Sequence, residues 1–86
     1  MKLEEDFQSA VGRSKLFTKR PSNEELLNMY SLFKQATEGD AAAERPTGFD
    51  FKAIAKFDAW FAKKGKSKEQ AKLEYVDLVG RLEKEN

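Results

Sequence analysis

The sequence of 86 residues contains neither cysteine nor histidine. Without cysteine the chain forms no disulfide and no thiolate metal site, and nothing in it suggests an oxidising compartment. Without histidine it lacks the commonest general base and the commonest metal ligand. We therefore expect no catalytic residues, no metal site and no cofactor.

Proline and long apolar runs are also scarce. Pro21 and Pro46 are the only prolines, and both lie between segments with helical periodicity. The opening MKLEEDF has acidic residues where a signal peptide needs an apolar run, and no stretch approaches the roughly 18 apolar residues of a membrane-spanning helix. We expect a cytoplasmic protein without stable membrane insertion.

The chain has almost no excess charge of either sign. Sixteen basic and fifteen acidic side chains leave a net charge of +1. A nucleic-acid-binding domain usually has a clear basic excess, so we expect no nucleic-acid partner. The charge is unevenly spread, however, because residues 52–72 contain seven lysines and two acids. This segment could receive an anion.

Helical periodicity and capping signals predict an all-α fold. The expected helices run over about 3–16, from Ser22 to about 37, over about 51–63, and from Ser67 almost to the end of the chain. Their N-terminal signals are two capping boxes and one single cap, formed by Ser22 with Glu25, Ser67 with Gln70, and Asp50. A chain of this length is about the size that one core can just stabilise. We therefore expect a single domain over residues 1–86.

The first and fourth helices have simple apolar faces. In the fourth, Ala71, Tyr75, Leu78 and Leu82 follow helical spacing and are expected to pack together. In the first, Gly12 costs about 1 kcal/mol relative to alanine. We therefore expect that something other than helix formation requires the small residue there.

The second helix has a wide apolar side. On a wheel of about 100° per residue, four residues lie within about 60° of Tyr30, namely Leu26, Leu27, Phe33 and Lys34. Three more apolar residues lie further round, namely Met29, Leu32 and Ala36. The apolar arc spans roughly 220°, about twice the stripe needed for packing on a core. The polar remainder is narrow and consists of Glu24, Asn28, Ser31 and Gln35. Such a helix is either buried on two sides, or buried on one and lined by a ligand on the other.

The third helix has an apolar arc beside a basic stripe. The arc contains Ala53, Ile54, Phe57, Trp60 and Phe61, and the stripe contains Lys52, Lys56 and Lys63. Together the helices could surround one hollow with two tyrosines, several lysines and apolar side chains. Simpler explanations remain open, since a lysine beside an apolar stripe usually snorkels to water and a tyrosine at helical spacing is more often part of the core. The residues alone indicate a ligand with an anionic and an apolar part as one interpretation.

Several longer runs make the sequence recognisable. They are YSLFKQATEGD (30–40), ERP (44–46), DFKAIAKFDAW (50–60) and SKEQAKLEY (67–75). With the four-helix spacing, they resemble the acyl-CoA-binding protein family over essentially the whole chain. The resemblance implies an up-down-down-up four-helix bundle. It also implies a cytoplasmic monomer that binds, buffers and transports medium- and long-chain fatty acyl-CoA esters without catalysis.

The resemblance further implies the binding residues. Six match family positions at or near the CoA head group, namely Tyr30, Lys34, Lys56, Tyr75, Lys15 and Lys52. Four are expected along the acyl chain, namely Leu26, Leu27, Phe33 and Phe7. Three positions depart from the family: Phe33 replaces a usual tyrosine, Phe57 a usual tryptophan and Ile54 a common lysine. We expect binding to survive with an altered preference.

Two other classes of function remain as alternatives. An enzyme without histidine or cysteine would need carboxylates or a lysine, and the acids here are scattered over capping and exposed positions. A helical module that binds protein or nucleic acid could use the same wide apolar helix. Detection of co-purified acyl-CoA by native mass spectrometry would favour the function that the family resemblance implies over these alternatives.

Overall fold

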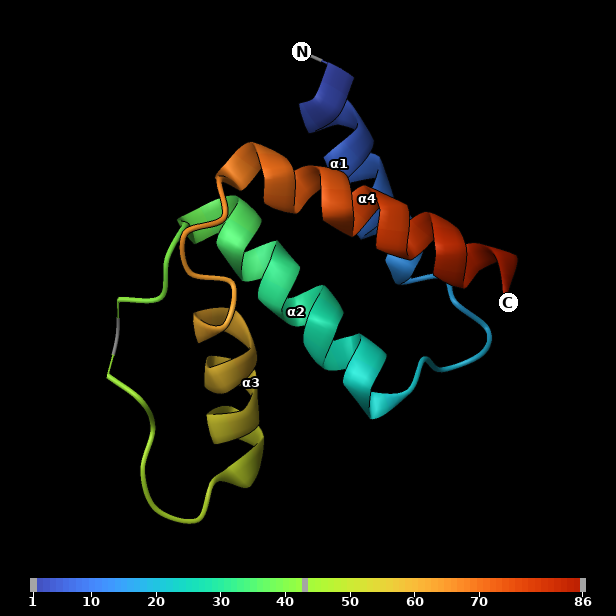
Figure 1. Ribbon diagram of the computed structural model, residues 1–86. Helices are drawn as coiled ribbons and strands as arrows, with labels where there is room; N and C mark the ends of the chain where they lie inside the picture. The colour runs from blue at the N-terminus through green and yellow to red at the C-terminus, as the bar shows by residue number, and fades with distance from the viewer. Residues whose placement is uncertain (1, 43, 86) are drawn as a thin grey trace.

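The computed structural model of the protein describes residues 2–42 and 44–85 (Figure 1). Within these residues the chain forms four α-helices and no strand. They are α1 (Lys2–Ser14), α2 (Asn23–Glu38), α3 (Phe51–Phe61) and α4 (Lys68–Lys84). The expected all-α, four-helix fold is confirmed, and residues 1, 43 and 86 of the expected domain lie outside the described part.

The helix caps largely follow the sequence signals. The Ser22 hydroxyl accepts a hydrogen bond from the Glu25 N–H at 3.1 Å, and the Ser22 N–H donates to Glu25 Oε1 at 3.2 Å. This reciprocal pair confirms the first capping box. The Ser67 hydroxyl accepts from the Gln70 N–H at 3.1 Å, but the Gln70 amide donates to Glu74 at 2.9 Å. The second box is therefore reduced to a single cap, because the glutamine side chain binds the next turn of its own helix.

Helix α2 lies at the centre of the arrangement. It packs against α3 on one side and α4 on the other, and α4 also packs against α1 (Figure 1). Helices α2 and α3 run in one direction and α1 and α4 in the other, as expected for an up-down-down-up bundle. The Cα atoms span 37 × 30 × 15 Å, so the bundle is flat. None of the helices in the described part of the chain is long and apolar enough to cross a membrane.

The core lies between α1, α2 and α4. Its buried apolar residues are Phe7, Ala10, Met29, Leu32, Ala36, Ala71, Tyr75, Leu78, Val79 and Leu82. The packing face expected for α4 is thereby confirmed. None of the residues of α3, all of which the structure describes, is buried. The third helix is therefore attached to a core that the other three helices form.

The buried side of α2 includes part of its polar strip. Ser31 and Gln35 are both completely buried, in line with Met29 and Leu32. The Ser31 hydroxyl donates a hydrogen bond to the Asn28 carbonyl at 2.9 Å. On the helical wheel this buried side lies roughly opposite Tyr30. The wide apolar arc is thus divided, with one part in the core and the part around Tyr30 left half-exposed.

Two polar contacts attach α3 and its preceding loop. The indole Nε1 of Trp60 donates to the Gly39 carbonyl at 2.8 Å, at the end of α2. The guanidinium of Arg45 holds the carboxylate of Asp58 by two hydrogen bonds of 2.9 and 3.0 Å. This bidentate pair lowers the pKa of the Asp58 carboxyl and ties the loop to α3. Asp50 caps the helix by accepting from the Ala53 N–H at 3.1 Å.

No packing contact among the described residues explains Gly12. A Cβ atom at this exposed position in α1 would meet no neighbouring heavy atom within 4 Å. We therefore expect Gly12→Ala to stabilise the fold by about 0.5–1 kcal/mol, because alanine restricts the unfolded chain more than glycine. Thermal unfolding followed by circular dichroism should show a higher midpoint. Gly39→Ala is the matched control and should lower it, because Gly39 has a φ of 80°; a lower midpoint for Gly12→Ala would contradict the prediction.

Candidate functional site

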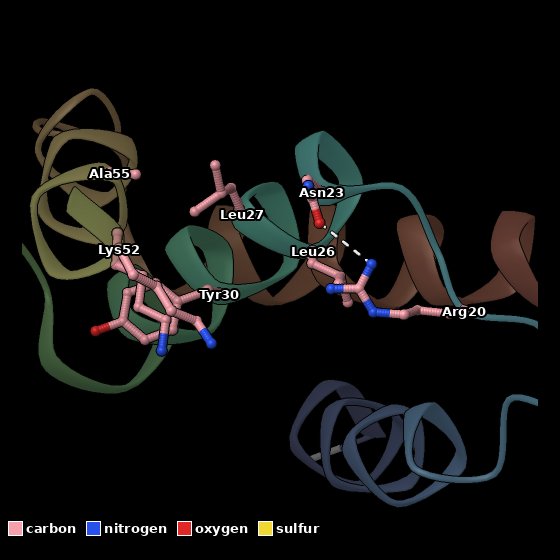
Figure 2. A pocket seen from close by; sticks show the side chains of 8 residues that line it. Arg20, Asn23, Leu26, Leu27, Tyr30, Lys52 and Ala55 are labelled. Atoms are coloured by element: carbon pink, nitrogen blue, oxygen red, sulfur yellow. Dashed lines mark hydrogen bonds between the residues drawn. The ribbon is translucent and has the colours of Figure 1, made fainter.

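A groove of about 390 Å³ lies between α2 and α3 (Figure 2). Its lining consists of Arg20, Asn23, Leu26, Leu27, Tyr30, Lys52, Ala55 and Lys56. Figure 2 shows Arg20 at one end of this set, Tyr30 and Lys52 at the other, and the two leucines between them. The groove therefore has cationic ends and an apolar middle.

The charge of the groove lining has one sign. Three of its described residues are basic, and none is acidic. Lys52 and Lys56 lie one turn apart on α3, where like charges repel. Among the described residues, no carboxylate forms an ion pair with either lysine. A bound anion would relieve this repulsion, so this end of the groove suits an anionic group.

Tyr30 and Lys56 contact each other across the groove. The ammonium of Lys56 lies 5.2 Å from the centroid of the Tyr30 ring, within the range of a cation–π interaction. This contact joins the middle of α2 to the middle of α3. It places an aromatic ring, a phenolic hydroxyl and an ammonium group within reach of one ligand.

Lys34 lies one turn beyond Tyr30 on α2 but does not line the groove. Its ammonium forms an ion pair with Glu38 and lies 4.9 Å from the centroid of the Trp60 ring. The hydrogen bond from Trp60 to Gly39 holds this ring in place. Lys34 is therefore positioned next to the groove end with its charge partly balanced.

Three of the expected site residues form an aromatic cluster at the junction of α1, α2 and α4. The ring of Phe7 is stacked on Phe33 at 6.0 Å and meets Tyr75 edge-on at 5.3 Å. Tyr75 is only 4% exposed, and its hydroxyl donates to Ser14 Oγ at 3.4 Å. From the sequence, both tyrosines could line one hollow, but the structure separates them. Helix α4 carries Tyr75 into the core, whereas Tyr30 faces α3.

The structure thus separates the ten expected residues into two groups. Those lining the groove are Leu26, Leu27, Tyr30, Lys52 and Lys56. Those outside it are Lys34, the aromatic cluster and Lys15, which is exposed in the turn after α1. The lysine stripe expected on the third helix is also divided. Lys63 lies beyond the end of α3, and it lines a different groove together with Ala59, Arg81 and residues of α2.

Sequence reasoning missed Arg20, Asn23 and Ala55. The guanidinium of Arg20 donates to Asn23 Oδ1 at 3.2 Å, which holds the cation over the start of α2. One signal could have identified it. Cations are unfavourable near the N-terminus of a helix because of the helix dipole. An arginine two residues before the Ser22 cap therefore does not stabilise the helix, which favours a role in binding.

Known proteins resemble this chain over most of its length. A sequence model described as "Acyl CoA binding protein" matches residues 4–79. An acyl-CoA-binding protein of Dictyostelium discoideum is 49% identical over 76 residues, which are 88% of this chain and 90% of that protein. Enoyl-CoA delta isomerase 2 of Rattus norvegicus is 47% identical over 79 residues, which are 92% of this chain but 20% of that protein. The crystal structure of Oryza sativa Acyl-CoA-Binding Protein 2 superposes with a TM-score of 0.92 at 41% identity, covering 96% of this chain and 92% of that one.

Proposed function

The chain belongs to the acyl-CoA-binding protein family, and we propose that it binds fatty acyl-CoA esters without converting them, and buffers and carries them inside the cell. The observation that carries this proposal is the groove between α2 and α3, which combines three cations, no described acid and two leucines. An acyl-CoA ester is complementary to this lining, with anionic phosphates at one end and a long alkyl chain at the other.

The head group is proposed to occupy the end of the groove near α3. Lys52 and Lys56 would bind phosphate oxygens, and each charge-assisted hydrogen bond of this kind contributes roughly 1.5–3 kcal/mol. Tyr30 would present its ring and hydroxyl to the adenine side of the ligand. Because Lys56 already contacts the Tyr30 ring, the two side chains would bind the nucleotide as a unit.

The acyl chain is proposed to run along Leu26 and Leu27 towards the start of α2. Each buried methylene contributes about 0.8 kcal/mol. Affinity should therefore rise with chain length until the groove is full, in the medium- to long-chain range. Arg20 and Asn23 would mark the far polar end of this path.

The expected residues outside the groove are proposed to act at its margins. Lys34 would extend the positive surface beyond Tyr30 by exchanging its ion pair with Glu38 for a phosphate. Lys15 would approach the head group from the turn after α1. Phe33 is half-buried and is the accessible edge of the aromatic cluster, through which Phe7 and Tyr75 would meet the ligand.

The departures from the family have different consequences under this proposal. Phe33 lacks the hydroxyl of the usual tyrosine, so a polar contact at the edge of the aromatic cluster is lost. Phe57 lies away from the groove, in a hollow with Arg45, Asp58 and Phe61. Its replacement of the usual tryptophan should therefore leave the bound nucleotide unaffected.

We further propose that residues 1–86 act as one binding domain, monomeric and cytoplasmic, with no nucleic-acid partner. The net charge of +1 offers little long-range attraction for nucleic acid.

Isothermal titration calorimetry tests the proposed function. We expect palmitoyl-CoA to bind at least about 100-fold more tightly than palmitate, since two phosphate contacts would be worth roughly 3 kcal/mol or more. Raising the salt concentration should weaken the binding of the ester more than the binding of palmitate, because salt screens the phosphate contacts. Absence of heat with palmitoyl-CoA would refute acyl-CoA binding. Equal affinities for ester and free acid would refute the assignment of the head-group residues.

A further inference from the structure

The outer side of α3 and the loop before it carry phenylalanines that the fold does not use. Phe49 is 91% exposed, Phe51 70% and Phe61 49%. Phe57 is stacked against Phe61 with ring centroids 6.0 Å apart, and Phe49 meets Phe51 edge-on at 6.4 Å. We name these four residues the phenylalanine patch. They are four of the seven phenylalanines in the chain, so most of its largest apolar side chains lie outside the core.

Packing does not explain the phenylalanine patch. The core is built by α1, α2 and α4, and α3 contributes no buried residue to it. The patch also differs from the ligand groove, because Phe57 and Phe61 line a hollow with Arg45 and Asp58, none of which lines that groove. The patch thus consists of two ring pairs outside the core, and exposed apolar surface of this kind on a small domain is typical of an interaction site.

The segment that carries the phenylalanine patch is rich in basic residues. The Lys64 ammonium lies 5.6 Å from the centroid of the Phe61 ring, and Lys52 follows Phe51 directly on α3. Residues 44–64 contain five basic and three acidic side chains. Of these acids, Asp58 is paired with Arg45 and Asp50 caps α3. The charge that the patch offers to a partner is therefore positive.

We propose that the phenylalanine patch docks the protein on membrane surfaces that contain anionic lipids. Aromatic side chains enter the boundary between head groups and acyl chains, while neighbouring lysines extend their ammonium groups to lipid phosphates. Phe49 and Phe51 project from a loop and a helix start and do not line a groove, which suits a bilayer better than a helical peptide that needs a groove. A second copy is disfavoured because pairing two patches would bring their lysines together.

Docking would place the ligand groove next to the bilayer. Lys52 follows Phe51 in the chain and lines the groove, so the groove would lie close to the lipid head groups. The proposal goes beyond the binding of acyl-CoA and does not depend on it, since none of the phenylalanine patch lines the ligand groove.

Co-sedimentation of the ligand-free protein with vesicles tests this proposal. We expect binding to phosphatidylcholine vesicles that contain phosphatidylserine, weaker binding to phosphatidylcholine alone, and loss of binding at high salt. The triple variant Phe49→Ser, Phe51→Ser, Phe61→Ser should reduce binding about tenfold or more. A matched double variant, Leu16→Ser with Leu73→Ser, also replaces exposed apolar residues and should bind like the wild type.

Two further measurements make the outcome decisive. Lys64→Gln should weaken vesicle binding, whereas Lys84→Gln, at the exposed end of α4, should not. The triple variant should keep its palmitoyl-CoA affinity, which shows that it is folded and separates this proposal from the proposed function. The proposal is overturned if the wild type ignores anionic vesicles or if the triple variant binds them equally well. Patch-dependent dimers without vesicle binding would identify a second copy as the partner instead.

Discussion

Lys56→Ala is expected to weaken palmitoyl-CoA binding about 10- to 150-fold. The estimate follows from the loss of one charge-assisted phosphate contact of roughly 1.5–3 kcal/mol. Lys56 is the lysine that both lines the groove and contacts Tyr30, so its removal also frees the ring that is proposed to meet the adenine. Calorimetry would measure the affinity. Thermal stability should change little, because Lys56 is not part of the core.

Lys63→Ala is the matched control for this variant. Lys63 lies in the turn that follows α3. On a wheel continued from that helix it falls on the same side as Lys56, but it lines a different groove. It should leave the affinity within about twofold of the wild type. Lys34→Ala should also weaken binding. If Lys63→Ala has the same effect as Lys56→Ala, the attraction is a general property of the basic helix and the α2–α3 groove is not the specific site.

Gln35→Leu is expected to destabilise the fold by about 2–4 kcal/mol. Gln35 is completely buried, and its amide nitrogen donates to Asp40 Oδ1 and to the Lys66 carbonyl, both at 2.8 Å. The Gly65 N–H donates to the same Asp40 oxygen at 2.9 Å. The two donors lower the pKa of the Asp40 carboxyl, with the Gly65 N–H the larger cause. The amide of Gln35 thus ties the end of α2 to the turn before α4.

Leucine would fill the space of Gln35 but would leave the Lys66 carbonyl without this donor and Asp40 Oδ1 with the Gly65 N–H alone. In a domain of this size each kcal/mol corresponds to about 4–8 °C, so the unfolding midpoint should fall by about 10 °C or more. Gln8→Leu is the control, because Gln8 is exposed on α1 and donates only to Glu4 among the described residues; it should change the free energy of unfolding by less than about 0.5 kcal/mol. An equally mild effect of Gln35→Leu would show that the buried amide does not hold the turn.

Local signals in the sequence were sufficient for the helices and most of their caps. The Ser22–Glu25 box and the Asp50 cap were predicted correctly because each involves residues three positions apart. The apolar face of α4 was predicted correctly for the same reason, since its spacing repeats along one helix. The Gln70 half of the second box failed because Glu74, also within reach on α4, provides a competing acceptor.

Helical periodicity could not decide which side of α2 is buried. The wheel identified a wide apolar arc around Tyr30, but a wheel contains no neighbouring helix. Ser31 and Gln35 lie on the buried side because their polar groups find partners in the Asn28 carbonyl, Asp40 and the Lys66 carbonyl. For Gln35, these partners come from outside its own helix.

The sequence by itself determined the four helices, the absence of histidine and cysteine chemistry, the excess of lysine in residues 52–72 and the family resemblance. These features depend on residue identity and short-range spacing. Only the tertiary structure decided that Tyr30 and Lys56 share a groove while Tyr75 lies in the core, and that the aromatic side of α3 faces outward. Those outcomes depend on how α2 is positioned between α3 and α4, and contacts between residues far apart in the chain set that position.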